Sequence, residues 1–298
     1  MSARALVLFG LAAALWGVSY LFMKVALEDG ISEGVILCLR TAFGAAVLIP
    51  IAVRQGALAS PRKALRPWVL AFALSQALIP FALIVLAENW IASGLTGILI
   101  AAAPIFLALI APFVDPEERS SGLALVGVGV GMAGVVVLFL ADLGSLGGMA
   151  IVGGLLVLGA AAVYGFAPLI FKLRIAPDPH VGALAVTMAL SAIVYLPWAL
   201  ATLPGGDVSA WSWLAIVGLG AGGTGVAFYA FYEVVDEVGP ARASLVAYVA
   251  PLFSVLYGVL LLSEPFTAGT AVGMVLILGG SWLAARRSPD AEGNPPVD

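Results

Sequence analysis

Ten long apolar runs divide almost the whole chain, and their length restricts the folds that it can adopt. The runs cover residues 5–27, 34–53, 67–87, 91–113, 121–140, 150–171, 180–201, 211–232, 241–262 and 266–285. A transmembrane helix needs about 20 mostly apolar residues, whereas a membrane barrel strand needs about 10. The runs also lack the alternation of apolar and polar residues that barrel strands require. We therefore predict an all-α membrane protein with ten transmembrane helices.

The composition agrees with this prediction and excludes several other classes of protein. Of the 298 residues, 62% are hydrophobic and 10% are charged, whereas soluble domains are about half apolar and a quarter charged. The single cysteine, Cys38, cannot form a disulfide framework or a Cys-rich metal site. The net charge of −4 provides no basic surface for nucleic acid. No Walker-type glycine loop and no cluster of His or Cys is present, so we expect no cofactor, no metal and no ATP-driven transport.

The basic residues lie on alternate sides of the predicted membrane. The N-terminus, the even-numbered loops and the C-terminal segment hold Arg4, Arg54, Arg62, Lys63, Arg66, Arg119, Lys172, Arg174, Arg242, Arg286 and Arg287, and the odd-numbered loops hold none. Basic residues near span ends stay in the cytoplasm. The pattern predicts a multi-pass protein of a cytoplasmic (inner) membrane with both termini in the cytoplasm. Residues 288–298 have three prolines and no apolar stretch, which predicts a disordered cytoplasmic tail.

The chain contains an internal repeat with a period of about 147 residues. Pro104 is followed by Glu117, and Pro251 is followed by Glu264, at the same separation of thirteen residues. We predict two five-helix repeats, 1–145 and 146–287. Because five is odd, the second repeat enters the membrane inverted, as in carriers that expose a midplane site alternately to each side. A chance repeat, or a duplication kept only for folding, is the alternative.

Two features of the repeat predict more specific roles. Pro104 and Pro251 each remove a helical hydrogen bond at matching positions, so we predict that they are paired hinges. Glu117 and Glu264 end matching spans shortly before the next helix begins. A carboxylate there favours the positive N-terminal end of that helix, and this predicts a structural role for both.

Several motifs resemble those of a known family. The first run contains Ala14-Leu15-Trp16-Gly17-Val18-Ser19-Tyr20 and then Lys24, the second contains Leu39-Arg40-Thr41, and the ninth region contains Gly239-Pro240-Ala241-Arg242-Ala243-Ser244, Pro251 and Ser263-Glu264-Pro265. In this order they resemble the ten-span EamA-type branch of the drug/metabolite transporter superfamily, from Leu6 to Ala285. The chain departs from the family pattern at Thr41, where an aromatic residue is common, and at Ser263, where glycine is usual. The resemblance implies a transporter, often an exporter of amino acids or related metabolites.

Only two charged residues lie well inside the predicted spans. Lys24 either extends to the membrane interface or has a function, and Arg40 either pairs with a backbone carbonyl or attracts an anionic group. No Asp, Glu or His lies at mid-depth, since Glu88 and Glu233 fall at span ends and His180 begins a span. Proton coupling therefore has no obvious carrier in the sequence.

Aromatic and hydroxyl side chains at mid-depth are the candidates for binding a substrate. They are Trp16, Tyr20, Gln76, Thr96, Tyr164, Thr224, Tyr229 and Tyr248. Tyrosine and tryptophan combine an apolar face with a hydrogen-bond donor, which suits an amino acid with an aromatic or other apolar side chain. Trp16 and Gln76 are the strongest candidates, and ordinary helix packing is the alternative for each. Two glycine faces, Gly127/Gly131/Gly134 and Gly218/Gly222/Gly225, indicate close helix packing.

The sequence therefore favours a secondary transporter of a small molecule whose outer surface contacts membrane lipid. We expect no catalytic residues. A drug, purine or sugar-phosphate carrier of the same superfamily is the alternative within transport, although a phosphate substrate would require more buried cations than this chain has. A channel or a membrane-embedded enzyme is the alternative outside it. The spans show no cluster of acids, histidines or nucleophiles that an enzyme would need. The oligomeric state does not follow from the sequence.

Overall fold

The structure is a computed structural model that describes residues 1–58, 66–114, 122–175, 179–239 and 243–284. The regular secondary structure of these residues is entirely helical. The helices are α1 (Ala3–Glu28), α2 (Glu33–Arg54), α4 (Pro67–Ala73), η1 (Leu74–Leu78), α5 (Ile79–Ala87), α6 (Ser93–Ile100), α7 (Ala103–Val114), α8 (Gly122–Leu146), α9 (Gly148–Tyr164), α10 (Phe166–Ile170), η2 (Phe171–Ile175), α11 (His180–Ala201), α12 (Ala210–Val217), η3 (Gly218–Val226), α13 (Ala227–Val238), α15 (Val246–Leu262) and α16 (Ala268–Ala284).

The helical segments agree with the ten predicted apolar runs. By length and composition, eight segments of the described chain are able to cross a membrane, and α15 and α16 are shorter apolar helices. The all-α, multi-pass prediction is therefore confirmed. Several predicted features lie outside the described residues: Arg62, Lys63, Glu117, Arg119, Pro240, Ala241, Arg242, Arg286, Arg287 and the tail 288–298.

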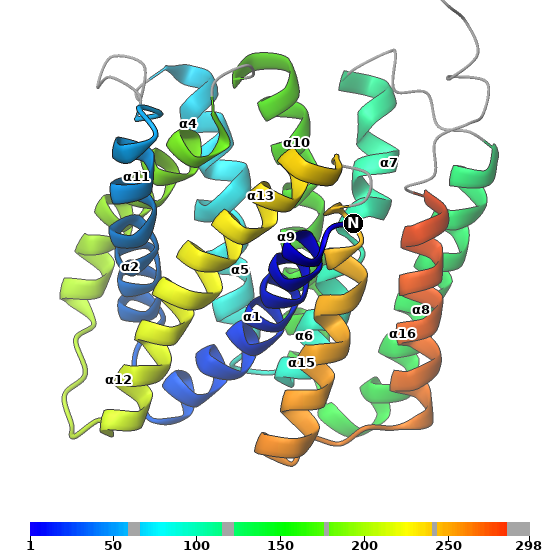
Figure 1. The fold of residues 1–298 in the computed structure, drawn as a ribbon. Helices are drawn as coiled ribbons and strands as arrows, with labels where there is room; N and C mark the ends of the chain where they lie inside the picture. Colours follow the sequence, from blue (N-terminus) through cyan, green and yellow to red (C-terminus); the bar gives the residue numbers. More distant parts are fainter. Residues whose placement is uncertain (59–65, 115–121, 176–178, 240–242, 285–298) are drawn as a thin grey trace, which may run out of the picture.

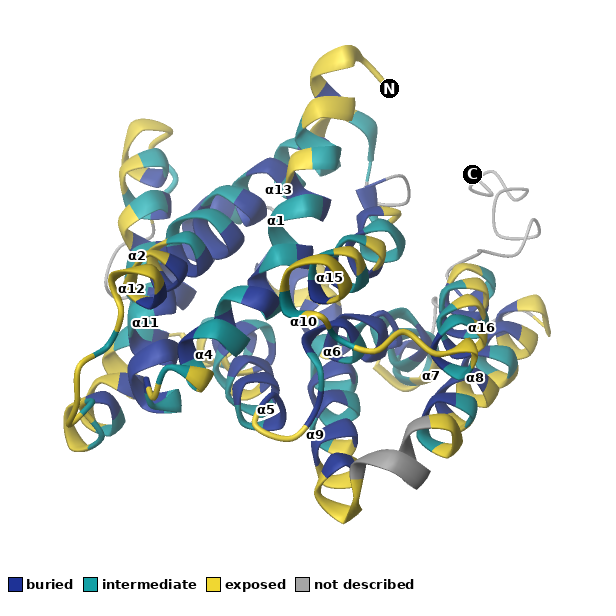
Figure 2. Ribbon diagram, turned by 90° about the horizontal axis from the view of Figure 1, so that it is seen from below, coloured by how far each residue is buried: buried dark blue, intermediate teal, exposed yellow. Residues whose placement is uncertain are grey.

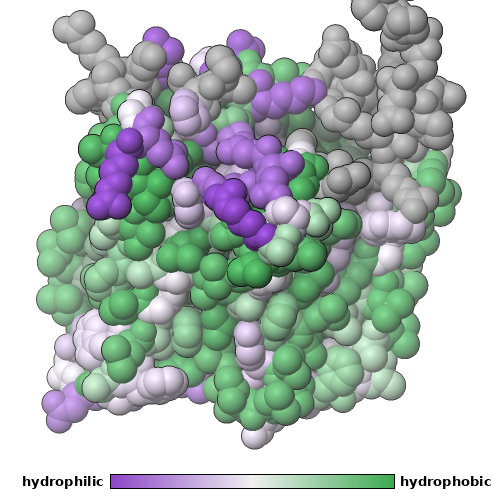
Figure 3. Space-filling view, in the orientation of Figure 1, coloured by the Kyte–Doolittle hydropathy of each residue, from purple (hydrophilic) through white to green (hydrophobic). Residues whose placement is uncertain are grey.

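The helices run between two ends of one bundle. Figure 1 shows the links α1–α2, α5–α6, α11–α12 and α15–α16 at its lower end. We call this the closed end, because polar contacts of Lys24 and Glu264 hold its segments together. Strongly hydrophilic residues gather at the upper end of the view in Figure 3, while the surface between the two ends is mainly hydrophobic. Seen from below, α8 and α16 lie side by side at one edge, and α2 and α11 lie at the opposite edge (Figure 2).

Three segments widen from α-helical to π-helical turns. The segment η1 precedes Pro80, whose missing N–H leaves the carbonyl of Gln76 without its usual partner. The segment η3 is rich in glycine, and the hydroxyl of Thr224 donates to the carbonyl of Leu219 at 3.1 Å. Wide turns of this kind turn side chains away from their usual helical positions and are frequent at functional sites.

Glycine allows the backbones of α8 and α16 to touch. A Cβ atom added to Gly280 would lie 2.3 Å from the nitrogen of Gly131, and one added to Gly134 would lie 2.9 Å from the carbonyl oxygen of Gly273. The predicted packing role of the first glycine face is therefore confirmed. In the second face, a Cβ atom added to Gly218 would lie 2.8 Å from the ring of Phe22, and one added to Gly225 would lie 2.6 Å from the side chain of Val47.

The two predicted hinge prolines lie in different surroundings. Pro104 follows a break in the fourth span, where α6 ends at Ile100 and α7 begins at Ala103. At this break the hydroxyl of Ser281 donates to the carbonyl of Ala101 at 2.6 Å. Pro251 instead lies within the uninterrupted helix α15. The two prolines match in sequence position, but only Pro104 adjoins an interruption of its helix.

Candidate functional site

Arg40 is a buried cation held between three parts of the bundle. It belongs to α2 and is 6% exposed. Its Nε donates to Oγ1 of Thr224 in η3 at 3.0 Å, and a terminal nitrogen lies 3.5 Å from the sulfur of Met23 in α1. The guanidinium also lies 3.7 Å from the ring centre of Phe81 in α5. In the part of the chain that the structure describes, no carboxylate comes within the 4.0 Å of an ion pair with Arg40.

This arrangement leaves Arg40 able to bind an anion. A guanidinium carries five N–H donors in a planar fork, and the contacts of Arg40 within the described residues use two of them. A buried charge is costly unless it is paired, so a ligand that brings a carboxylate gains a strong, charge-assisted interaction here.

The π-helical segment η3 is what brings Thr224 to Arg40. Thr224 is fully buried, and its hydroxyl both accepts from Arg40 and donates to Leu219. A Cβ atom added to Gly220 would lie only 2.8 Å from the carbonyl oxygen of Arg40. Glycine at this position thus permits η3 to lie directly against α2.

Four aromatic residues lie near the guanidinium. Tyr20 in α1, Tyr164 in α9 and Tyr195 in α11 all lie close enough to Arg40 for electrostatic interaction. The hydroxyl of Tyr195 donates to the carbonyl of Leu78, which fixes its position. Phe81 contacts the guanidinium directly through its ring face. A buried cation with one aromatic face beside it and tyrosines nearby is suited to a ligand with one acidic group and an apolar body.

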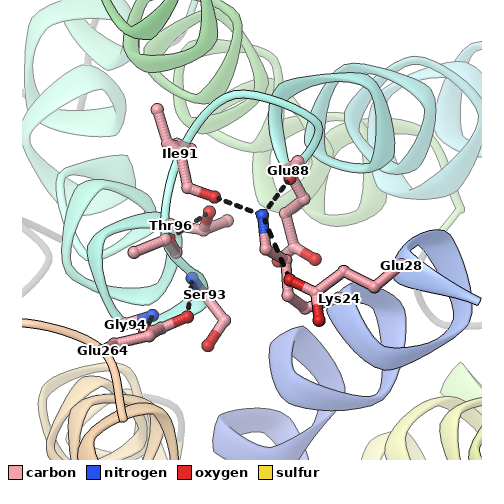
Figure 4. Close-up of polar contacts among 9 residues, drawn as sticks. Lys24, Glu28, Glu88, Ile91, Ser93, Gly94, Thr96 and Glu264 are labelled. Carbon is pink, nitrogen blue, oxygen red and sulfur yellow. Dashed lines mark hydrogen bonds and ion pairs between the residues drawn. The ribbon is translucent and has the colours of Figure 1, made fainter. Parts of the chain in front are cut away.

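A network of polar contacts joins α1 to the loop 88–92 at the closed end. Nζ of Lys24 donates to the carbonyl oxygens of Glu88 and Ile91, at 2.8 and 3.4 Å, and lies 4.0 Å from Oε1 of Glu28 (Figure 4). Because its side chain is only 19% exposed, Lys24 does more than extend to the membrane interface. It ties the first span to the link between the third and fourth spans.

Glu264 strengthens the same end from the other half of the chain. Its Oε1 accepts from the N–H of Ser93 at 2.7 Å and its Oε2 from that of Gly94 at 2.9 Å, so it caps α6 (Figure 4). The structural role predicted for Glu264 is correct, but the helix that it serves is not the following one. Helix α16 begins only at Ala268, whereas the N-terminus of α6 is directly within reach.

Replacing Glu264 by alanine is expected to lower the free energy of unfolding by about 1–2 kcal/mol, the usual effect of removing a helix N-cap. The substitution leaves the two N–H groups of α6 without their acceptor. Thermal unfolding of the purified protein in detergent measures the change. Glu28→Ala is the matched control, since the side chain of Glu28 is 60% exposed. Equal stability of the two variants would contradict the capping role.

A cavity of about 290 Å³ lies near the opposite end of the bundle, where α2 ends and α11 begins. It is lined by Gln55, Phe171, Pro179, His180, Val181, Leu184, Tyr229, Tyr232, Glu233 and Asp236. The ring of His180 is stacked between Phe171 and Tyr232, with ring centres 4.2 and 4.4 Å apart. The cavity therefore combines flat aromatic faces with two carboxylates.

The structure brings some of the predicted substrate-binding residues together and separates others. Tyr20, Tyr164 and Thr224 lie around Arg40. Trp16 packs instead on Phe228 and Phe231, with ring centres 5.6 and 5.1 Å apart. The ring of Trp16 therefore packs α1 against α13, which agrees with the alternative of helix packing.

The remaining candidates lie apart from the Arg40 cluster or face their own helix. The hydroxyl of Thr96 donates to Ala92 of its own helix at 3.2 Å. Tyr248 donates to the carbonyl of Ser281, which joins α15 to α16. Tyr229 lines the cavity near the upper end, and Gln76 is half-buried in η1.

Glu88 is a buried carboxyl that the sequence does not reveal. It follows the third apolar span and was expected to lie at a span end, yet it is fully buried. Neither of its carboxylate oxygens has a hydrogen-bond partner in the described structure. Burial raises the pKa of Glu88 well above its usual range. Glu88 lies in the loop 88–92, whose position depends on contacts with distant segments such as Lys24. No local sequence signal therefore marks this carboxyl.

Comparison with known proteins agrees with this architecture. The EamA-like transporter family model matches residues 3–140 and 151–286. An uncharacterized transporter of Archaeoglobus fulgidus is 29% identical over 202 residues, which cover 68% of this chain and 71% of the relative. The aromatic amino acid exporter YddG of Ancylobacter novellus is 29% identical over 187 residues, which cover 61% of this chain and 63% of that relative.

A solved crystal structure has the same fold. It matches with a TM-score of 0.67 at 22% sequence identity, covering 95% of this chain and 98% of that one. The apolar helices, the motifs of the first, second and ninth spans and the family match over both parts of the chain lead to one conclusion. The protein belongs to the EamA-like transporter family of the drug/metabolite transporter superfamily.

Proposed function

We propose that this transporter is a secondary carrier that exports amino acids with aromatic or other apolar side chains. The observation that carries the proposal is the buried guanidinium of Arg40, which has no carboxylate partner among the described residues and lies against the ring of Phe81 with three tyrosines nearby. An amino acid brings the missing carboxylate and an apolar side chain. The similarity to an aromatic amino acid exporter supports this substrate class.

The carrier works by alternating access in this proposal. The cavity near Gln55 and His180 is the entrance at one end, and the contacts of Lys24 and Glu264 close the other.

The separate family matches over 3–140 and 151–286 support two repeats, 1–145 and 146–287. The charge pattern supports an inner membrane location with both termini and the cavity on the cytoplasmic side. Substrate then enters from the cytoplasm. An enzymatic function is not part of the proposal.

Counterflow in proteoliposomes tests the substrate class. Vesicles loaded with unlabelled phenylalanine are expected to accumulate labelled phenylalanine transiently and with saturation. Competition by tyrosine and tryptophan is expected, and competition by the corresponding amine, which lacks the carboxylate, is not. Flux without saturation would indicate a channel. Absence of counterflow for every amino acid would refute the substrate class while leaving the family unchanged.

Pro104 is proposed as a hinge of this cycle, because it adjoins the break between α6 and α7. Pro104→Ala restores an N–H that can bond to Ile100 and favours a continuous helix. A backbone hydrogen bond contributes about 1 kcal/mol, so we expect about a fivefold lower transport rate with little loss of folded protein. Pro251→Ala is the matched comparison from the other repeat. Normal counterflow in both variants would rule out the hinge role.

A further inference from the structure

The carboxyl group of Glu88 is an exception among the buried polar groups. Both of its oxygens are inaccessible and lack a hydrogen-bond partner within the described structure, where the only other such atoms belong to the hydroxyls of Ser93 and Thr187. An unbonded hydroxyl costs little by comparison with an unbonded ionised carboxylate, whose burial without a partner costs several kcal/mol or more. The conformation seen here therefore favours the neutral acid.

The charges of Lys24 and Arg40 attract an ionised Glu88, but neither side chain forms a hydrogen bond to its carboxylate in this conformation. Lys24 in α1 directs its hydrogen bonds to the backbone carbonyls of Glu88 and Ile91. Arg40 in α2 bonds to Thr224, and Glu264 caps α6. None of the ion pairs of the described chain includes the Glu88 carboxylate.

The other titratable groups that face this region are acidic or neutral. Glu28 lies beside Lys24, and Glu33 at the start of α2 accepts from the side chain of Asn89 at 3.0 Å. Helix α9 packs against the loop through Gly153 and carries Tyr164 as its titratable residue. The carboxylates of Glu28 and Glu264 add repulsion to an ionised Glu88 rather than relieving it.

Glu88 belongs to the contact that closes this end. Its backbone carbonyl is one of the two that Lys24 holds against α1, and Ser93 and Gly94, which begin the next helix, are held by Glu264 (Figure 4). If α1 and the loop separate, water reaches the carboxyl and Nζ of Lys24 loses its carbonyl partners. Access of water favours the ionised form of Glu88 and outweighs the loss of attraction by the Lys24 charge, because burial is the largest cause of the raised pKa.

We propose that Glu88 is a proton-binding site whose protonation accompanies closure of this end of the transporter. The carboxylate takes up one proton from the water on that side as the end closes and returns it as the end opens. The occupant is a proton rather than a metal ion, because the described residues contain no group of three His, Cys, Asp or Glu that would hold a metal. The inference rests on the alternating access proposed above, but not on the substrate.

The sign of the pH effect follows from this linkage. The closed form binds the proton more tightly than the open form, so acid favours closure and alkali favours opening. Between the ordinary glutamate pKa and the raised value, the ratio of open to closed molecules increases by up to about tenfold per pH unit. Glu88→Gln removes the proton site and makes this ratio independent of pH.

Infrared spectroscopy tests the protonation state without any transport assay. At neutral pH the full-length protein is expected to show the carbonyl stretch of a protonated carboxyl, which Glu88→Gln removes and Glu28→Gln retains. Glu28 is the matched control, since it is also near Lys24 but has an exposed side chain. Absence of a band that Glu88→Gln removes would overturn the proposal. Should this variant not fold, Glu88→Asp must shift the band, and an unchanged band would equally overturn it.

Cysteine labelling tests the link between protonation and opening. In a Cys38→Ala background, Ser93→Cys places a thiol at a fully buried position of the closed end. The rate of maleimide labelling is measured from about pH 5 to about pH 9 and divided by the rate in the additional Glu88→Gln variant, which cancels the thiol's own titration. This ratio is expected to rise at least about fivefold with pH. A ratio independent of pH would overturn the proposal.

These measurements separate the present inference from the proposed substrate. Neither the infrared band nor the labelling ratio requires an amino acid. Failure of amino-acid counterflow together with a pH-dependent labelling ratio would reject the substrate class alone. Normal counterflow with no Glu88 band would reject the proton site alone.

Discussion

Arg40→Gln is expected to abolish most of the counterflow of aromatic amino acids while the protein stays folded. A charge-assisted hydrogen bond contributes about 1.5–3 kcal/mol, so the loss of one corresponds to about a 10- to 150-fold loss of affinity. Stability is expected to persist, because the glutamine removes a buried charge. The hydroxyl of Thr224 also retains the carbonyl of Leu219 as its acceptor.

Two further variants make this test specific. Arg54→Gln makes the same change at the exposed end of the same helix and is expected to transport normally. Arg40→Lys keeps the charge but loses the planar fork, so it is expected to recover only part of the activity. Binding of phenylalanine measured by calorimetry separates a loss of affinity from a slower cycle. Wild-type affinity in Arg40→Gln would show that the guanidinium does not bind the substrate carboxylate.

Gly280→Leu is expected to prevent formation of the folded protein. A Cβ atom at this position would lie 2.5 Å from the Cα of Gly131 and 2.7 Å from the carbonyl oxygen of Gly127. The atoms in the way belong to the backbone of α8 and cannot rotate aside as a side chain can. Overpacking usually costs about 1–3 kcal/mol, and a contact with backbone lies at or beyond the upper limit of that range.

The neighbouring residue supplies the matched control for this prediction. A Cβ atom added to Gly279 meets no other atom within 4 Å, so Gly279→Leu is expected to fold and to elute as a single species. Both variants carry the same side chain in the same helix turn and differ only in the face that it occupies. Size-exclusion chromatography after extraction in mild detergent compares them. Equal yields of folded protein would contradict close packing of α8 on α16.

The sequence predicts the helical architecture well because long apolar runs have few alternatives in a membrane. Each expected run corresponds to a helical segment, and the glycine spacing in α8 correctly indicates close packing. Arg40 and Thr224 both stand out in the sequence as candidates. Their contact, however, depends on the π-helical turn of η3, which a 3.6-residue period does not reveal.

Other parts of the site depend on contacts between distant segments. Glu264 caps a helix that begins 171 residues earlier in the sequence, although the next helix along the chain was the expected partner. Glu88 follows the apolar span like any loop residue, yet in the fold it is fully buried beside the contacts of Lys24 with the carbonyls of Glu88 and Ile91. Hydropathy reports the depth of a residue in a membrane, whereas burial within protein depends on its neighbours in space.

The pairing of α8 with α16 also bears on how the protein is made. Ribosomes synthesise α8 before α16, and the last residue of α8, Leu146, precedes the first residue of α16, Ala268, by more than a hundred positions. The glycine surface of α8 must therefore wait in lipid or against the insertion machinery while four further spans are inserted. Docking of α16 is a late step of biogenesis, and a nascent chain that stalls before it presents quality-control proteases with an unpaired glycine-rich helix.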